Sequence, residues 1–219
     1  MSALAVAGYL VGAYLIGSIP FAFLTARALA GADLREVGSG TVSGTGVGQT
    51  VGFWAMALSG VLDILKAVVV VVFVMGSHPL LAAFGAGAAA IGHNWSVYLR
   101  GAGGRALSVA LGVTLVMAWP GLLVLAFGMG VFRIFRQTGI GSFLAQVALP
   151  IVLPLTAGLP LTVEEPVVGL TLGLALVVPM WAKRLVGNHP RERQQPAVYV
   201  SRLLFDNDTG WPVAADGTD

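Results

Sequence analysis

Long runs of apolar residues constrain this chain more than any other feature of its sequence. The first run extends from Ala3 to Ala28, and a helix needs about 20 such residues to cross a bilayer. Only 10% of all residues are charged, against about 25% in soluble domains. Inside a bilayer, backbone polar groups must pair within the membrane, which favours helices. The sequence therefore predicts an all-α, polytopic integral membrane protein.

Further apolar runs follow, and one of them is ambiguous. The runs occupy residues 51–75, 80–99, 106–132, 142–161 and 167–182. As a single helix, the run at 106–132 would measure about 40 Å, which is more than the hydrocarbon core requires. Trp119-Pro120-Gly121 in its middle is a turn signal, so the same run can also form two short spans.

Small residues at helical spacing indicate where helices can pack closely. Gly8 and Gly12 form such a pair in the first run, and Gly169 and Gly173 form another in the last. Pro20, in the segment Gly17-Ser18-Ile19-Pro20, predicts a kink because proline leaves a backbone carbonyl of the helix without its donor.

The Lys and Arg residues are distributed unevenly, and their positions predict the topology. All twelve except Lys66 lie at or beside three polar loops, at 33–49, 100–105 and 133–141, or in the tail that begins at Lys183. The turns at 76–79, 119–121 and 162–166 contain none. Because cytoplasmic segments carry the Lys/Arg excess, the loops and the tail are expected on the cytoplasmic side.

This placement also resolves the ambiguous run. An even number of crossings must separate neighbouring cytoplasmic loops, so residues 106–132 are expected to form a hairpin of two spans. We therefore expect about seven transmembrane helices, with the N-terminus outside and the C-terminus in the cytoplasm. Residues 1–186 form the transmembrane domain in this interpretation, and residues 187–219 form a polar cytoplasmic tail.

The three polar loops are rich in residues that bind anions. Glycine lets the backbone present consecutive N–H groups, and arginine adds a planar fork for phosphate oxygens. Helices that begin at Thr50 and Ala106 would add the positive ends of their dipoles. Neither of the two glycine-rich loops is a Walker A or dinucleotide motif. The residues alone leave a second interpretation open, in which the glycines only make tight turns and the arginines only anchor the topology.

Composition excludes several other kinds of site. The chain has no cysteine, so it has neither a disulfide framework nor a cysteine metal site. Its scattered basic residues form no nucleic-acid-binding face, and it carries no nucleic-acid motif.

Two ionisable residues lie within the second apolar run. Asp63 and Lys66 are three residues apart and therefore share one helix face. They form an internal ion pair, or they face a wet cavity, as ionisable residues within spans usually do. We expect this face to point toward the same cavity as the first polar loop.

Six ordered motifs resemble those of a known family. The chain has, in order, Gly17-Ser18-Ile19-Pro20, Asp33-Leu34-Arg35-x-Val37-Gly38-Ser39-Gly40, Leu62-Asp63-x-Leu65-Lys66, Gly92-His93-x-x-x-Val97, Gly103-Gly104 and Ala110-Leu111-Gly112-Val113. Together they are similar to the motifs of the bacterial acyl-phosphate:glycerol-3-phosphate acyltransferases, the PlsY type. The resemblance covers most of the chain up to Arg136.

The resemblance implies a reaction and a place for it. An acyl group would move from acyl phosphate to the 1-hydroxyl of glycerol 3-phosphate, giving lysophosphatidate for phospholipid biosynthesis. The family also implies seven spans, a multi-pass location in the bacterial inner membrane among its lipids, and a site that faces the cytoplasm. No metal and no organic cofactor are implied.

The resemblance also suggests roles for individual residues. Ser39, His93 and Arg105 are the catalytic candidates, and His93 acts either as a general base or as a hydrogen-bond strut. Acyl phosphate is already activated, so catalysis can rest on positioning and charge stabilisation without a protein nucleophile. The candidates for phosphate binding are Gly38, Gly40, Thr41, Gly103, Gly104 and Arg136. The candidates for structural support are Asp33, Arg35, Asp63 and Lys66, of which the first two can pair with each other or with the third loop.

Several loop residues differ from the family's pattern and keep alternatives open. Thr41 and Gly46 stand where the family has asparagines, Gln49 stands where it has an arginine, and Ala102 replaces a lysine. The leading alternative is a non-catalytic paralogue that binds a lipid phosphate or a membrane partner, because function depends on the site rather than on the fold. A transporter is the weakest alternative, since no internal repeat is evident.

Overall fold

A computed structural model describes residues 1–37, 40–187 and 196–206 of the chain. Within these ranges the regular elements are all helical, which confirms the predicted all-α class for the described part. The elements are α1 (Ala3–Ser18), α2 (Phe21–Ala30), α3 (Gly44–Thr50), α4 (Phe53–Val72), α5 (Pro79–Asn94), the 3-10 helix η1 (Val97–Leu99), α6 (Leu107–Met117), α7 (Trp119–Ile134), α8 (Thr138–Leu155), α9 (Pro166–Val186) and α10 (Pro196–Phe205).

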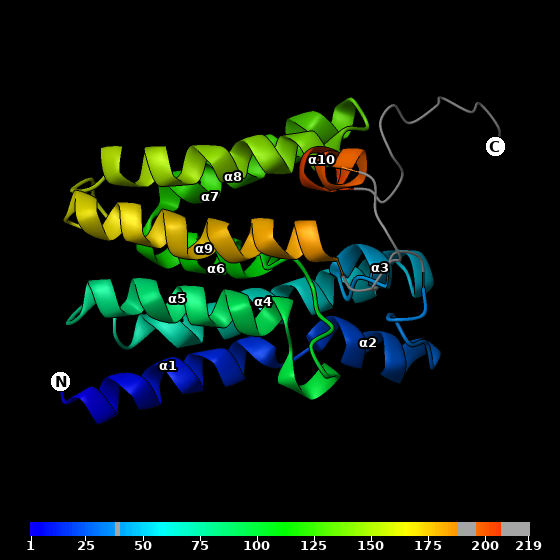
Figure 1. Cartoon of the computed structure of the whole chain (residues 1–219), viewed down its shortest axis with the longest axis horizontal. Coiled ribbons are helices and arrows are strands. Elements are labelled where there is room, and N and C mark those ends of the chain that lie inside the picture. The colour runs from blue at the N-terminus through cyan, green and yellow to red at the C-terminus, as the bar shows by residue number, and fades with distance from the viewer. Residues whose placement is uncertain (38–39, 188–195, 207–219) are drawn as a thin grey trace.

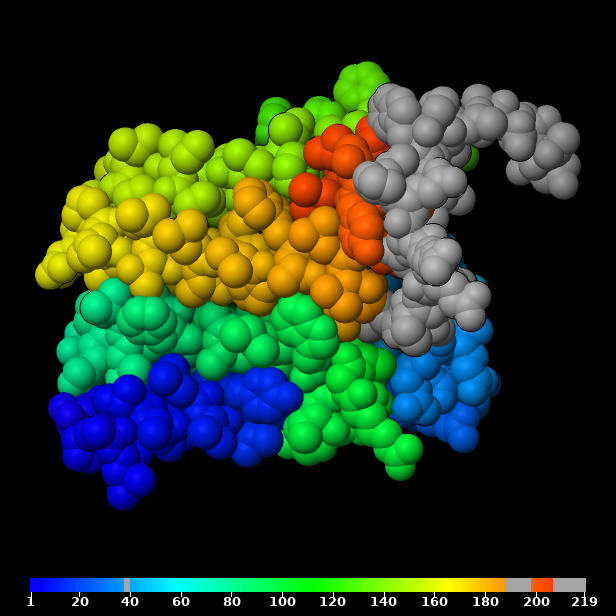
Figure 2. Space-filling model, viewed as in Figure 1, coloured from blue at the N-terminus to red at the C-terminus, as the bar shows by residue number. Residues whose placement is uncertain are grey.

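The long helices form a bundle of roughly parallel axes (Figure 1). On one face α1, α5, α9 and α8 pack side by side in that order, and Figure 2 shows them as adjacent bands. Behind them α4 packs against α6, α6 against α7, and α7 against α8. The short helices α2, α3 and α10 lie at one end of the bundle, where they can shape a site (Figure 1).

Several helices have the length and composition of membrane spans. Those that qualify are α4, α8, α9 and the segment Ala3–Ala30, which contains α1 and α2. The helices α6 and α7 are also apolar but shorter. The helix is interrupted between α1 and α2 at Ile19 and Pro20, as the proline predicts. The Ile19 N–H donates to the Ile16 carbonyl at 3.1 Å.

The run at 106–132 forms two helices rather than one, as predicted. The helices α6 and α7 meet at Ala118, which makes an antiparallel bridge to Thr162. The indole of Trp119 donates to the Pro160 carbonyl at 3.0 Å. These contacts hold the hairpin turn beside the turn that connects α8 and α9.

The interior of the bundle contains many small residues beside leucines such as Leu149 and Leu172, and large apolar residues cover its outside. Leu4, Trp54 and Phe73 are each more than 80% exposed, whereas the alanines of α5 that face the core are fully buried. This distribution fits a surface that contacts lipid, since lipid tails are as apolar as these side chains and helices associate through close packing of small residues.

Close helix packing uses only one of the two predicted glycine pairs. A methyl group added at Gly169 or Gly173 would overlap the backbone of α8, so these residues pack as expected. The expectation for Gly8 and Gly12 is wrong within this chain, because an added methyl group would meet no atom within 4 Å. The contact of α1 with α5 is instead made at Gly17.

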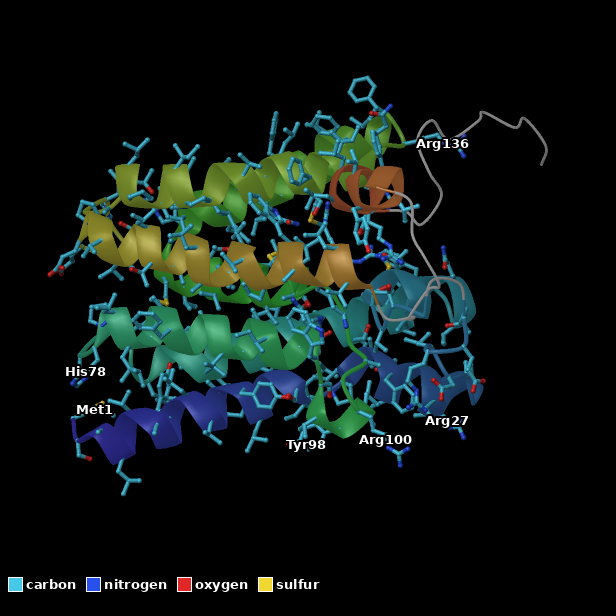
Figure 3. All side chains as sticks on the ribbon, in the orientation of Figure 1. Met1, Arg27, His78, Tyr98, Arg100 and Arg136 are labelled. Atoms are coloured by element: carbon cyan, nitrogen blue, oxygen red, sulfur yellow. The ribbon has the colours of Figure 1, made fainter. Side chains whose placement is uncertain are left out.

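The polar loops gather at one end of the bundle. Figure 3 shows Met1 and His78 at one end and Arg27, Arg100 and Arg136 at the other. The three labelled arginines therefore lie at one end of the bundle, and the turn that contains His78 lies at the other.

One local expectation needs correction. Thr50 does not begin a helix: it ends the short helix α3, and the next helix begins at Phe53 after Gly52, whose φ is +123°. The segment from residue 187, interpreted as a polar tail, contains the helix α10, which packs against α8 and α9.

Candidate functional site

The first polar loop is held by an ion pair and by contact with the second loop. Arg35 donates from Nη2 to Asp33 Oδ2 at 2.6 Å and from Nε to Oδ1 at 2.9 Å, so these two residues pair with each other. The hydrogen bonds from Arg35 lower the pKa of Asp33 to about 2. Farther along, the Val42 N–H donates to the Gly103 carbonyl at 3.2 Å, which joins the two loops.

A buried network surrounds Lys66. Its Nζ lies 2.7 Å from Asp63 Oδ1, 2.6 Å from the Ile19 carbonyl oxygen and 3.1 Å from His93 Nδ1. The side chains of Lys66 and Asp63 are only 3% and 5% exposed. Lys66 therefore ties the break between α1 and α2 to α4 and α5.

The same network decides what His93 can do. An ammonium group has only donors, so a charged Lys66 requires Nδ1 of His93 to accept and leaves the ring proton on Nε2. The side chain is only 9% exposed. This geometry favours the hydrogen-bond strut over the general base.

The glycine pair of the second loop packs against the end of α5. A methyl group at Gly103 would overlap the backbone of His93 and Asn94, and one at Gly104 would overlap the His93 ring. The Gly104 N–H donates to the His93 carbonyl at 3.0 Å. This amide is therefore committed to the fold, and the pair is required for the close approach of the loop to the helix.

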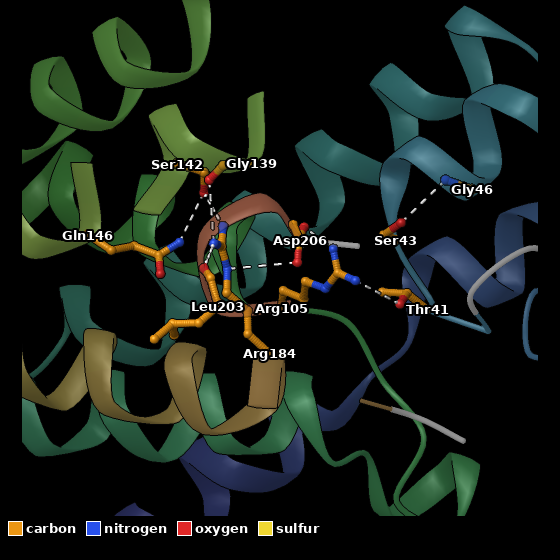
Figure 4. Close-up of polar contacts among 10 residues, drawn as sticks. All are labelled: Thr41, Ser43, Gly46, Arg105, Gly139, Ser142, Gln146, Arg184, Leu203 and Asp206. Carbon is orange, nitrogen blue, oxygen red and sulfur yellow. Dashed lines mark hydrogen bonds and ion pairs between the residues drawn. The ribbon is translucent and has the colours of Figure 1, made fainter. Parts of the chain in front are cut away.

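Arg105 carries the positive charge of the second loop into the site. Its Nη1 contacts the carboxylate of Asp206, and its Nη2 donates to Thr41 Oγ1 at 3.4 Å (Figure 4). The side chain is 30% exposed. Arg105 therefore lies between the first loop and the C-terminal segment.

A second arginine, Arg184 of α9, is almost fully buried and joins three helices. It donates to Ser142 Oγ of α8 at 2.9 Å and to the Leu203 carbonyl of α10 at 2.7 Å. The side-chain amide of Gln146 donates to the same Ser142 Oγ at 2.9 Å (Figure 4). Hydrogen bonds to charged groups typically contribute about 1.5–3 kcal/mol each, so this network fixes α10 on the bundle.

A cavity of about 1020 Å³ lies beside these groups. Its polar residues include Thr41, Ser43, Gln49, Arg105, Arg133 and Asp206. Its apolar wall, from α4, α6 and α7, includes Met56, Ile64, Leu107, Leu111 and Met129. Asp63 and His93 also line it, so the Asp63 part of the charged face of α4 points toward the same cavity as the first loop, whereas Lys66 is not among the lining residues. A cavity of this size can hold a ligand with both a polar and an apolar part.

The structure brings some of the remaining candidate residues to this cavity and not others. Gly103 and Gly104 line a separate cavity of about 10 Å³, and the Gly40 N–H bonds to the Val37 carbonyl at 3.0 Å in a turn. Arg136 is exposed and is not among the residues that line either cavity (Figure 3). Gly38 and Ser39 lie outside the described residues.

Arg184 and Asp206 are among the residues of the site that have no assigned role in the sequence interpretation. Arg184 carries a signal, because it is a charged residue at the end of an apolar run that would be expected to seek a partner. The sequence gives no such signal for Asp206, because nothing in the local sequence shows that the end of α10 lies beside the second loop.

Metal binding finds no support in the described part of the chain. Across residues 1–37, 40–187 and 196–206, no three His, Cys, Asp or Glu side chains come together as a metal site requires.

Comparison with protein families and sequences gives consistent matches. The family model described as glycerol-3-phosphate acyltransferase matches residues 7–187. A glycerol-3-phosphate acyltransferase of Synechococcus sp. (strain CC9902) is 33% identical over 81% of this chain and 90% of its own length. The protein of the same name from Gluconobacter oxydans (strain 621H) is 33% identical over 84% of this chain and 91% of its own length.

Solved structures with the same fold exist. The crystal structure of PlsY, an integral membrane glycerol 3-phosphate acyltransferase, in its lysophosphatidic acid form matches with a TM-score of 0.69 at 22% identity, over 82% of this chain and 88% of that one. Its glycerol 3-phosphate form matches with a TM-score of 0.63 at 27% identity, over 80% of this chain and 88% of that one.

Proposed function

Because this chain belongs to the glycerol-3-phosphate acyltransferase family, we propose that its cavity transfers an acyl group from an acyl phosphate to glycerol 3-phosphate. The observation that best supports this function is that one cavity has both a polar end, with two arginines, and an apolar wall. The products would be lysophosphatidate and inorganic phosphate. The acceptor and the lipid product correspond to the ligands named for the two PlsY crystal structures.

The polar end of the cavity suits a phosphate group. Arg105 and Arg133 line it, and guanidinium groups donate in a fork that fits phosphate oxygens. The hydroxyl of Thr41 lies within reach of Arg105, at 3.4 Å from Nη2. The phosphates of donor and acceptor would therefore bind between the first and second loops.

The apolar wall suits an acyl chain. Met56, Ile64, Leu111 and Met129 come from three helices and face the cavity. These side chains are as apolar as lipid tails, so an acyl chain can leave the bilayer for the cavity without losing its apolar surroundings. An acyl phosphate would therefore bind with its chain along α4, α6 and α7 and its phosphate near Arg105.

The chemistry needs no protein nucleophile. The 1-hydroxyl oxygen of the acceptor attacks the acyl carbonyl carbon, the bond from that carbon to the phosphate oxygen breaks, and the departing phosphate takes the hydroxyl proton. A guanidinium at Arg105 stabilises negative charge that develops on the phosphate and the carbonyl oxygen. His93 is held by Lys66 through Nδ1, so we assign it to positioning the loops.

We place the loop end of the bundle at the cytoplasmic side of the bacterial inner membrane. Counting α1 and α2 as one crossing, the spans are α1–α2, α4, α5, α6, α7, α8 and α9. This arrangement puts the N-terminus outside and every polar loop with Lys or Arg inside, in agreement with the positive-inside rule.

The direct test is an assay with the purified full chain in detergent. With acyl phosphate and glycerol 3-phosphate supplied, the chain should form lysophosphatidate and release phosphate. Arg105→Ala should lower kcat/KM by about 10- to 150-fold, because it removes a charge-assisted interaction of about 1.5–3 kcal/mol. Arg100→Ala is the matched control, since Arg100 is exposed in the same loop and does not line the cavity.

Other outcomes would contradict this function. If Arg105→Ala is as active as the control, Arg105 does not bind the substrate. Binding of glycerol 3-phosphate without any product would indicate a non-catalytic paralogue. Ser39→Ala extends the test to the part of the first loop outside the described residues.

A further inference from the structure

The helix α10 lies beyond the part of the chain that the family model matches, which ends at residue 187. It is nevertheless firmly docked at the loop end of the bundle. Arg202 is 4% exposed and donates from Nη1 to the Leu185 carbonyl at 3.1 Å. A methyl group at Gly139 would overlap the backbone of Phe205, so α8 and the end of α10 are in close contact.

The residue that follows α10 points its carboxylate at the site. Asp206 takes a left-handed φ of +62°, and its N–H closes the helix by donating to the Arg202 carbonyl at 3.1 Å. One carboxylate oxygen contacts Arg105 Nη1, and the other lies 3.8 Å from Arg184 Nε. Figure 4 shows the carboxylate between the two guanidinium groups, and Asp206 also lines the large cavity.

A carboxylate and a phosphate oxygen are alternative partners for the same guanidinium group. Each accepts a hydrogen bond from the N–H groups, and each neutralises the same charge. They cannot occupy one N–H position together, and two anions a few ångströms apart repel each other. A phosphate that binds at Arg105 Nη1 must therefore displace Asp206.

We propose that Asp206 is a built-in competitor of the substrate's phosphate, occupying with its carboxylate the place at Arg105 that the phosphate takes. This inference rests on the proposed function only in using Arg105 as the phosphate-binding cation. The competition lowers the apparent affinity for phosphate, because only the fraction of molecules with Arg105 released binds. It leaves the chemical step unchanged once the substrate is bound.

The test uses the full chain in lipid nanodiscs, with inorganic phosphate and glycerol 3-phosphate as separate probes in calorimetric titrations. Asp206→Asn and Asp206→Gly both remove the carboxylate, and both residue types tolerate a left-handed backbone. Each variant should bind both probes about three- to tenfold tighter than the wild type. The KM for glycerol 3-phosphate should fall by a similar factor while kcat stays the same.

Glu36→Gln is the matched control, because it makes the same charge change at an exposed residue of the first loop that does not line the cavity. It should bind both probes like the wild type. Equal or weaker phosphate binding by the folded Asp206 variants would overturn the inference and make Asp206 a positioning residue for Arg105. If the Asp206 variants bind phosphate more tightly but neither they nor the wild type transfer an acyl group, the inference about Asp206 stands and the proposed function is wrong.

Discussion

Lys66 is a buried charge that contacts three separate segments of the protein. The three-residue spacing puts Asp63 on the same helix face, where an internal ion pair is one of two interpretations, and the structure shows that pair at 2.7 Å. Two further partners come from distant parts of the chain: the Ile19 carbonyl, at the helix break made by Pro20, and His93 at the end of α5. One ammonium group therefore connects three helical segments below the site.

Removing this ammonium group should destabilise the whole protein. Lys66→Met leaves Asp63 buried without its cation, and breaking a buried pair in this way costs about 3–5 kcal/mol. The expected result is a clear fall in the thermal unfolding temperature in detergent. The double variant Asp63→Leu with Lys66→Met should recover part of the loss, because neither charge then remains; a double variant less stable than the single one would contradict this account.

The Asp33–Arg35 pair should make a pH-dependent contribution to stability. The folded-state pKa of Asp33, about 2, lies below its ordinary value, so the stabilisation is present above about pH 4 and is lost as the pH falls toward 2. Arg35→Gln removes the hydrogen bonds that cause the shift. The difference in unfolding temperature between wild type and variant should be constant from pH 5 to 7 and should shrink between pH 4 and 3. A difference that grows in acid would contradict the assignment.

At the scale of the helices, close packing depends on which glycines meet a neighbour. In the α1–α5 contact, a methyl group at Gly17 would overlap the backbone of Ala89, whereas one at Gly12 would meet nothing within 4 Å. Periodicity alone does not distinguish these two positions, because both occur in the same apolar run.

Gly17→Ala should therefore destabilise the protein by about 1–3 kcal/mol, since an overpacked contact forces the backbones of two helices apart. Gly12→Ala is the matched control in the same helix and should leave the unfolding temperature unchanged or slightly higher. Thermal unfolding of both variants in the same detergent makes the comparison. Equal effects of the two substitutions would show that the α1–α5 contact does not depend on Gly17.

At the scale of the whole molecule, the turns between the helices lie at the two ends of the bundle. The turns that contain His78 and Glu164 carry neither Lys nor Arg, while Arg100 and Arg136 belong to the loops at the site. The chain has no cysteine of its own, so single cysteines report on these ends directly.

Single-cysteine labelling should place the two ends on opposite sides of the membrane. His78→Cys and Glu164→Cys should react with a membrane-impermeant maleimide in intact cells, because both residues are exposed at the end without cationic loops. Arg100→Cys and Arg136→Cys, also exposed, should react only after the inner membrane is permeabilised. The reverse pattern would invert the proposed topology, and labelling of all four in intact cells would contradict the separation of the ends.

Local sequence was sufficient to predict the all-α class, two helices within residues 106–132 and the break at Pro20. It offered the pairs Asp63–Lys66 and Asp33–Arg35 as one of two interpretations each, and the structure shows both pairs. Each depends on the chemistry of neighbouring residues: apolar run length, a turn signal, a missing N–H or a helical spacing. The sequence also placed the polar loops at one end, because their charges are tied to topology.

Only the tertiary structure decided which residues contact one another within the site. It showed that the Gly104 N–H is used by His93, that Arg136 is exposed away from the cavities, and that Asp206 reaches Arg105 across 101 positions of the chain. Such contacts depend on how helices pack against one another, and that packing is a property of all the helices together. For this reason the loop sequences suggest candidate anion-binding residues, while the partners of those residues appear only in the folded structure.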